Sequence, residues 1–108
     1  MTHRPPLTLC QSSDGWSYHA PGSTDEDIAS GAARPVLTGP GRPSPADHRA
    51  ARMMWERGLY QGDQIEVDGE AGRIVGRLPE CGTMRPSWVT VSWFGGVRGP
   101  CAVRGLSA

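Results

Sequence analysis

The chain has 108 residues, and its eleven Lys and Arg residues balance eleven Asp and Glu residues, which gives a formal net charge of zero at pH 7. Fifteen Gly and ten Pro residues exclude a long helical bundle or a coiled coil, because both residue types break helices. The charge balance excludes a strongly charged nucleic-acid-binding tail, and no apolar run is long enough for a transmembrane helix. The composition predicts a small, turn-rich, mostly β domain with a loosely ordered extension.

Residues 1–43 are predicted to be a loop-rich and partly disordered extension, because they carry six of the ten prolines and almost no periodic apolar pattern. A short helix is expected near 24–30. Ser23 or Thr24 can cap its N-terminus, acidic residues follow in the first turn, and Gly31 can end it. One or two helical turns are not stable alone in water, so this helix needs support from elsewhere in the chain.

The extension is expected to be separable from the folded unit. Residues 36–45 are predicted to be a linker, and a chain that begins at Pro43 is expected to unfold cooperatively. In the alternative interpretation, the extension packs on the rest of the chain through Trp16, Tyr18 and Ile28.

A second helix is predicted over 44–58. Ser44 is suited to the N-cap, Pro45 to the first helical position, and Asp47 completes a capping pattern with Ser44. Gly58 is suited to end the helix. The apolar residues that recur at helical spacing, and are therefore expected in the core, are Ala46, Ala50, Met53 and Met54.

Residues 60–108 are predicted to form a small β-barrel of four to five strands, preceded by this helix. From Tyr60 onward, apolar and polar residues alternate with the period of two that is typical of strands. Gly or Pro residues mark every turn between them. The expected strands are 64–69, 72–78, 87–94 and 101–106.

The alternation assigns each strand residue to a core face or an outer face. The core face is expected to carry Ile65, Val67, Ile74, Leu78, Val89, Val91, Trp93, Cys101 and Val103. The outer face is expected to carry Arg73, Val75, Arg77, Trp88, Thr90, Ser92 and Phe94, with Arg85, Arg98 and Arg104 beside them. Two large aromatic side chains and several arginines on one exposed sheet face exceed what solvation requires. In the alternative interpretation, the N-terminal segment or the helix covers Trp88 and Phe94.

The segments GDQIEVDGEAGRIVGRLP (62–79) and WVTVSWFGG (88–96) resemble the opening strands of small Src-homology-3-like barrels such as KOW and Tudor modules. The shared features are a Gly-Asp pair, an alternating strand and a glycine-centred hairpin, carried by Gly62, Asp63, Gly69, Gly72 and Gly76. The resemblance implies a barrel over 60–106, although the turn at 68–72 is shorter than in KOW modules and lysine is absent. The segment 16–31 is similar to small uncharacterised phage and prophage proteins from GC-rich hosts, which implies a phage-encoded protein but no mechanism.

No enzyme is expected, because the sequence lacks the nucleotide-binding, zinc-protease and serine-hydrolase patterns. The N-terminus has no signal-peptide core, and the cysteines Cys10, Cys81 and Cys101 form no closely spaced pair. Both observations favour a cytoplasmic protein over a disulfide-stapled secreted one. The three histidines are too scattered for a recognisable metal site, so we expect no metal and no cofactor.

Two functions of different classes fit the outer face. In the first, the barrel is an adaptor that binds a protein, because aromatic residues and arginine dominate interface energetics. In the second, the same face binds single-stranded nucleic acid by stacking bases on the aromatic rings. Residues 57–108 carry six arginines against five acids, and this near-neutral balance favours a protein partner over nucleic acid. The predicted binding residues are Trp88, Phe94, Arg73, Arg77, Arg85 and Arg98.

Overall fold

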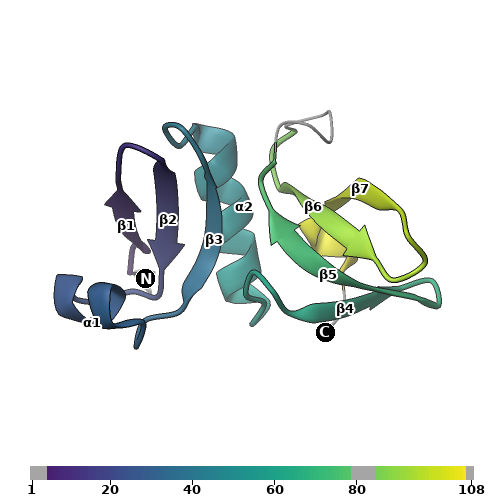
Figure 1. Cartoon of the computed structure of the whole chain (residues 1–108), viewed down its shortest axis with the longest axis horizontal. Helices are drawn as coiled ribbons and strands as arrows, with labels where there is room; N and C mark the ends of the chain where they lie inside the picture. The colour runs from purple at the N-terminus through teal and green to yellow at the C-terminus, as the bar shows by residue number, and fades with distance from the viewer. Residues whose placement is uncertain (1–4, 79–84, 107–108) are drawn as a thin grey trace, which may run out of the picture.

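The computed structural model describes residues 5–78 and 85–106, and it contains two antiparallel β-sheets with a helix between them (Figure 1). In the N-terminal sheet the strand order is β1 (Thr8–Gln11), β2 (Gly15–His19) and β3 (Pro35–Pro40). In the C-terminal sheet the order is β4 (Gln64–Val67), β5 (Glu70–Gly76), β6 (Trp88–Trp93) and β7 (Arg98–Ala102). The helices are α1 (Asp25–Ser30), α2 (Pro45–Glu56) and a short 3₁₀ helix, η2 (Val103–Gly105). The prediction of a mostly β protein is confirmed.

The N-terminal sheet contradicts the prediction that residues 1–43 are a loop-rich extension and that 36–45 is a linker. Its three strands pair antiparallel, and a bulge in β3 places both Val36 and Leu37 in the interior. The sequence does not reveal this sheet because β1 and β2 are only four and five residues long. Strands of that length carry too few residues to establish a period of two, and their stability comes from packing on distant elements.

Both helices begin as predicted, each with a capping box. In α1 the Asp27 N–H donates to the Thr24 hydroxyl and the Thr24 N–H donates to the Asp27 carboxylate, and Gly31 ends the helix in the left-handed conformation. In α2, Ser44 and Asp47 make the same two hydrogen bonds, at 3.2 and 2.8 Å. Each box satisfies backbone N–H groups that the start of a helix leaves unpaired. No helix in the described ranges is long and apolar enough to cross a membrane.

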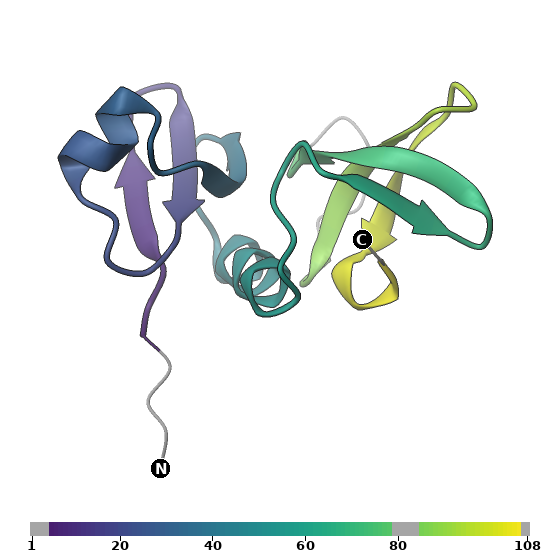
Figure 2. The ribbon, with the colours of Figure 1, turned by 90° about the horizontal axis from the view of Figure 1, so that it is seen from below.

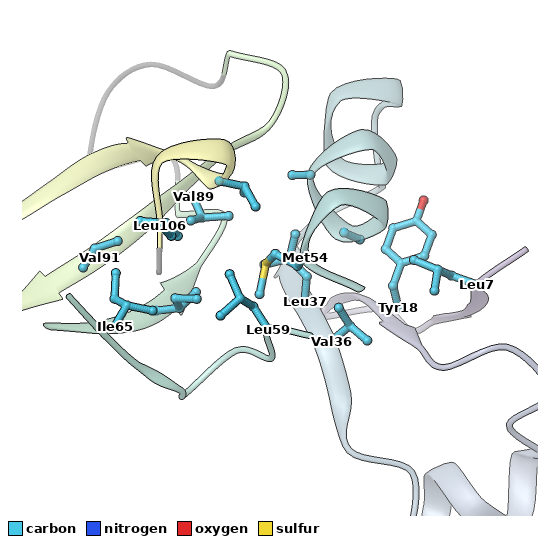
Figure 3. Close-up of a cluster of buried hydrophobic side chains, with 14 of the residues drawn as sticks. Leu7, Tyr18, Val36, Leu37, Met54, Leu59, Ile65, Val89, Val91 and Leu106 are labelled. Carbon is cyan, nitrogen blue, oxygen red and sulfur yellow. The ribbon is translucent and has the colours of Figure 1, made fainter. Parts of the chain in front are cut away.

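Helix α2 is the layer that the two sheets share (Figures 1 and 2). It packs against β3 and against η2, and it buries Ala50, Ala51 and Met54 completely. In the close-up of the core, Met54 lies beside Leu37 of the N-terminal sheet and beside Leu59 (Figure 3). The buried side chains of both sheets therefore form one continuous apolar cluster. Of the four helix residues expected in the core, two are fully buried and two are half-buried.

A bulge near the end of β5 reverses the face that the following residues present. Ile74 pairs with Val91 and Gly76 pairs with Thr90, so Val75 is an extra residue opposite β6. Gly76 has a φ of 138°, and a Cβ atom there would lie 3.1 Å from a carbonyl oxygen of β3. Only glycine adopts this conformation and permits this approach without strain. The side chain after Gly76 consequently points into the protein instead of out of it.

Several side chains differ from the predicted faces. Arg77 and Thr90, both expected on the outer face, are 1% and 3% exposed. The last strand covers 98–102 instead of 101–106, because the chain turns into η2 at Val103. Five of the nine residues expected in the core are fully buried, and the half-buried ones are Val67, Leu78, Trp93 and Cys101.

A chain that begins at Pro43 is now expected to lose cooperative unfolding. Burial of each large apolar side chain contributes about 2 kcal/mol, so five of them contribute on the order of 10 kcal/mol, which is comparable with the whole stability of a small domain. Urea unfolding followed by circular dichroism checks this against the full chain, and a sigmoidal transition in the shorter chain would contradict it. The buried side chains that the truncation removes are Leu7, Trp16, Tyr18, Val36 and Leu37.

Tyr18 makes the stability of the fold sensitive to alkaline pH. Burial raises the pKa of Tyr18 above its ordinary value, and the nearby charge of Asp47 raises this pKa further. Because the unfolded chain releases the Tyr18 proton first, this contribution to stability is complete below about pH 10 and is lost as the pH rises further. Tyr18→Phe keeps the ring and removes the titration. We expect its urea midpoint to fall less steeply than that of the wild type above about pH 10, and parallel curves would contradict this assignment.

Candidate functional site

The structure separates the predicted binding residues into four places, of which the first is a row across the C-terminal sheet. Arg73 pairs with Ser92 and Ser92 pairs with Arg98, so these three side chains share one face. Adjacent strands lie about 4.8 Å apart, which separates the two arginine backbones by about 10 Å. Both arginine side chains are exposed. Arg73, Ser92 and Arg98 are called the arginine row below.

The second place is a pocket of about 350 Å³ at the hairpin between β6 and β7. Phe94 is 56% exposed and Val97 is 65% exposed, so this end of the sheet presents apolar surface to solvent. Phe94 is therefore not covered by the N-terminal segment or by α2. The pocket, called the tip pocket below, is lined by Glu70, Ala71, Trp93, Phe94, Gly95 and Val97.

Phe94 connects the tip pocket to the arginine row. Its N–H donates to the carbonyl oxygen of Ala71 at 3.0 Å, which holds the residue against β5. The guanidinium carbon of Arg73 lies 5.9 Å from the centre of the Phe94 ring, within the range of a cation–π contact. The N–H of Trp93 donates to the carbonyl oxygen of Val97 at 2.8 Å and closes the hairpin. An aromatic ring and a cation are thus held together on a hydrogen-bonded scaffold.

The third place is the opposite end of β6, where Trp88 and Arg85 lie. Phe94 follows Trp88 by six positions, which corresponds to about 20 Å of strand, so the two predicted aromatic anchors do not form one site. Trp88 is half-buried, and the guanidinium carbon of Arg85 lies 5.6 Å from the centre of a Trp88 ring. A separate pocket of about 220 Å³ adjoins Trp88 and includes Met53 of α2.

Arg77, which was predicted to bind a partner, lies in the interior and carries a structural ion pair. Its Nε donates to Oδ1 of Asp47 at 2.6 Å. Its Nη1 donates to the carbonyl oxygen of Arg85 at 3.0 Å and to that of Trp88. The prediction was wrong because the extra residue in β5 turns Arg77 away from the face that carries Arg73.

One polar pair outside the predicted site has the hydrogen bonds of a serine nucleophile and its base. Ser17 Oγ lies 2.8 Å from His19 Nε2, and His19 Nδ1 lies 2.9 Å from the carbonyl oxygen of Ala33. A carbonyl only accepts, so the neutral ring donates from Nδ1 and accepts the Ser17 hydroxyl at Nε2. His19 is buried, and no carboxylate in the described part of the chain forms an ion pair with it. The pair therefore fixes β2 against the loop that contains Ala33.

The other side chains considered for a reactive site are the possible metal ligands and the cysteine thiols. No group of three or more His, Cys, Asp or Glu residues within 5–78 and 85–106 is placed to hold a metal ion. Cys10 and Cys101 are free thiols, and burial raises the pKa of the Cys101 thiol, which disfavours the nucleophilic thiolate. Cys81 lies outside the described residues.

Comparisons of the chain with family models, with curated proteins and with solved structures give no match. The arginine row and the tip pocket together form the candidate site. Of the predicted binding residues they contain Arg73, Arg98 and Phe94.

Of the residues that line the tip pocket, Phe94 alone was predicted from the sequence, and Trp93 and Val97 are the two large apolar residues that sequence reasoning missed. Trp93 has the parity of a core residue, but the sheet ends just beyond it, so its ring is only partly covered. Val97 was assigned to a turn with no role. The signal that could have found them is the order of residues in SWFGGV, where two aromatic side chains precede a Gly-Gly turn. Apolar residues that flank such a turn lie at an exposed hairpin tip.

Asp47→Asn is expected to destabilise the fold by about 3–5 kcal/mol, because it leaves the buried Arg77 guanidinium without its carboxylate. Ser44→Ala, which weakens the α2 cap and keeps the ion pair, is the matched control and should cost about 1 kcal/mol. The double variant Asp47→Asn/Arg77→Met should lose less than the sum of its single variants. Urea titration measures all four, and an equal loss in Asp47→Asn and Ser44→Ala would contradict the assignment.

Proposed function

We propose that the chain is a cytoplasmic, non-enzymatic binding module that holds a segment of a partner protein at the tip pocket. The observation that carries the proposal is the exposure of Phe94 and Val97 beside a pocket whose wall includes Trp93. Exposed apolar side chains that adjoin a pocket are typical of interaction sites, and aromatic anchors contribute most of the energy at such sites. The hairpin is closed by backbone hydrogen bonds, so little conformational entropy is lost when a partner binds.

We propose that the C-terminal sheet and η2 form a small Src-homology-3-like barrel. The C-terminal sheet has four sequential antiparallel strands followed by the 3₁₀ helix η2, and this order is compatible with the Src-homology-3-like barrel expected from the sequence. In such a module the strands provide a rigid scaffold and the hairpin tips provide the binding residues. Because one fold serves many functions, the partner is inferred from the tip pocket and not from the barrel.

Single-stranded nucleic acid is the second candidate, because Phe94 can stack a base while Arg73 and Arg98 contact phosphates. Two observations favour a protein instead. The chain has no net charge, whereas phosphate-binding proteins normally carry a basic excess. Trp88, which would supply a second stacking platform, lies about 20 Å away along β6.

Phe94→Ala is expected to weaken binding of peptide partners by about 2 kcal/mol, or about thirtyfold, because it removes the exposed anchor. Peptide partners are obtained by panning a random dodecapeptide display library against the full chain, and their affinities are measured by fluorescence anisotropy. Leu9→Ala is the matched control, because Leu9 is an exposed apolar side chain on the N-terminal sheet. Its effect on affinity should be small.

Two results would contradict this proposal. One is a library that yields no peptide whose binding depends on Phe94. The other is a labelled oligothymidylate that binds at low salt and whose affinity falls steeply with salt, with a slope of about −0.7 per phosphate contact.

A further inference from the structure

We infer that the partner segment is acidic: it places an apolar side chain in the tip pocket and carboxylates on Arg73 and Arg98. This inference rests on the proposed function and extends it to the chemical class of the partner. It is carried by the juxtaposition of two exposed guanidinium groups with an exposed phenyl ring on one face of the C-terminal sheet.

Among the residues that the structure describes, neither Arg73 nor Arg98 pairs with an acidic side chain. Three other arginines each pair with a carboxylate at 3.4 Å or less, namely Arg34, Arg52 and Arg77. Within 5–78 and 85–106, no carboxylate oxygen lies within 4 Å of either Arg73 or Arg98. Arg73 and Arg98 lie on one sheet face with Ser92 between them. Like charges repel each other, and a ligand that brings negative charge between them relieves this repulsion.

The arrangement suits carboxylates that flank an apolar side chain. The planar guanidinium fork binds a carboxylate through two parallel hydrogen bonds. Arg73 lies over the Phe94 ring at 5.9 Å, and a guanidinium group in a cation–π contact can still donate N–H groups to an acceptor. The backbones of Arg73 and Arg98 are about 10 Å apart, so one short segment can reach both. Phe94 contacts Arg73 directly, which places the apolar anchor and the first carboxylate next to each other.

Two acidic side chains near the candidate site favour a peptide partner with separate carboxylates over a nucleic-acid partner with a continuous row of phosphates. Gln64 pairs with Arg73, so Glu66, two residues further along β4, presents its side chain on the same face. Glu70 lines the tip pocket itself. A continuous phosphate backbone would pass close to these carboxylates and be repelled by them. A peptide can instead place small or polar residues opposite them.

Two panels of labelled dodecapeptides test the inference. In both panels Phe, Leu or Trp stands at the centre of a Gly-Ser background. The first panel carries Glu or Asp near the centre on both sides, and the second carries Gln or Asn at the same positions. Fluorescence anisotropy with the full chain gives the affinities at about 50 and 300 mM NaCl, which changes the Debye length more than twofold.

The acidic panel should bind about tenfold more tightly than the neutral panel, and added salt should reduce this difference. Arg73→Gln and Arg98→Gln should each weaken the acidic peptides about three- to tenfold and leave the neutral peptides unchanged. Arg49→Gln is the matched control, because Arg49 is an exposed arginine on α2 and should have no effect. Circular dichroism verifies that each variant is folded.

The outcomes distinguish this inference from the proposed function. Equal binding of the two panels, with a loss on Phe94→Ala, overturns the acidic partner and leaves the proposed function standing. An effect of Arg49→Gln as large as that of Arg73→Gln also overturns the inference, since the attraction would then come from overall charge. Binding of neither panel overturns it as well. Binding of an oligothymidylate that depends on Arg73 and Arg98 overturns both the inference and the proposed function.

Discussion

The buried ion pair between Arg77 and Asp47 is the interaction on which the arrangement of the two sheets depends. The Asp47 carboxylate accepts from Arg77 with Oδ1 and from the Ser44 N–H with Oδ2, so one side chain both caps α2 and neutralises a buried cation. Arg77 in turn donates to the carbonyl oxygens of Arg85 and Trp88. Desolvation of two charges is costly, and only a complete set of hydrogen bonds compensates it. The pair therefore specifies one position of β5 and β6 relative to the first turn of α2.

The bulge at Val75 determines which arginine side chain of this segment is exposed and which is buried. Without the extra residue, Arg77 would share the face of Arg73 and would leave Asp47 buried without a cation. Gly76 makes the bulge possible, and the same close approach lets the Arg77 N–H donate to the carbonyl oxygen of Thr38 in β3. A single backbone irregularity thus joins the two sheets and leaves Arg73, but not Arg77, on the exposed face that carries Phe94.

Local sequence signals predicted the parts of the fold that local interactions determine. Both helices were predicted because their capping boxes lie within four residues of chain, and β5 and β6 because their alternation is long enough to read. The N-terminal sheet was missed because its short strands gain their stability from α2, which follows them in the chain. Strand parity placed Arg73 and Phe94 correctly on one face, whereas Arg98 was expected in a turn beside that face and lies in β7. Strand parity failed for Arg77, because the alternation of apolar and polar residues does not reveal the β-bulge at Val75.

The two ends of β6 consequently have different roles. At its start the strand is held by Arg77 through the Trp88 carbonyl, and Thr90 is already buried, so this end has little freedom to adapt to a ligand. At its other end the strand passes into a hairpin at which Phe94 and Val97 are exposed. A binding site at a free tip on a fixed strand presents its aromatic ring and its arginines in a preorganised geometry, which reduces the entropy lost on association. For the proposed binding module, the ion pair that holds the start of β6 thus also limits the freedom of the strand that carries the tip pocket.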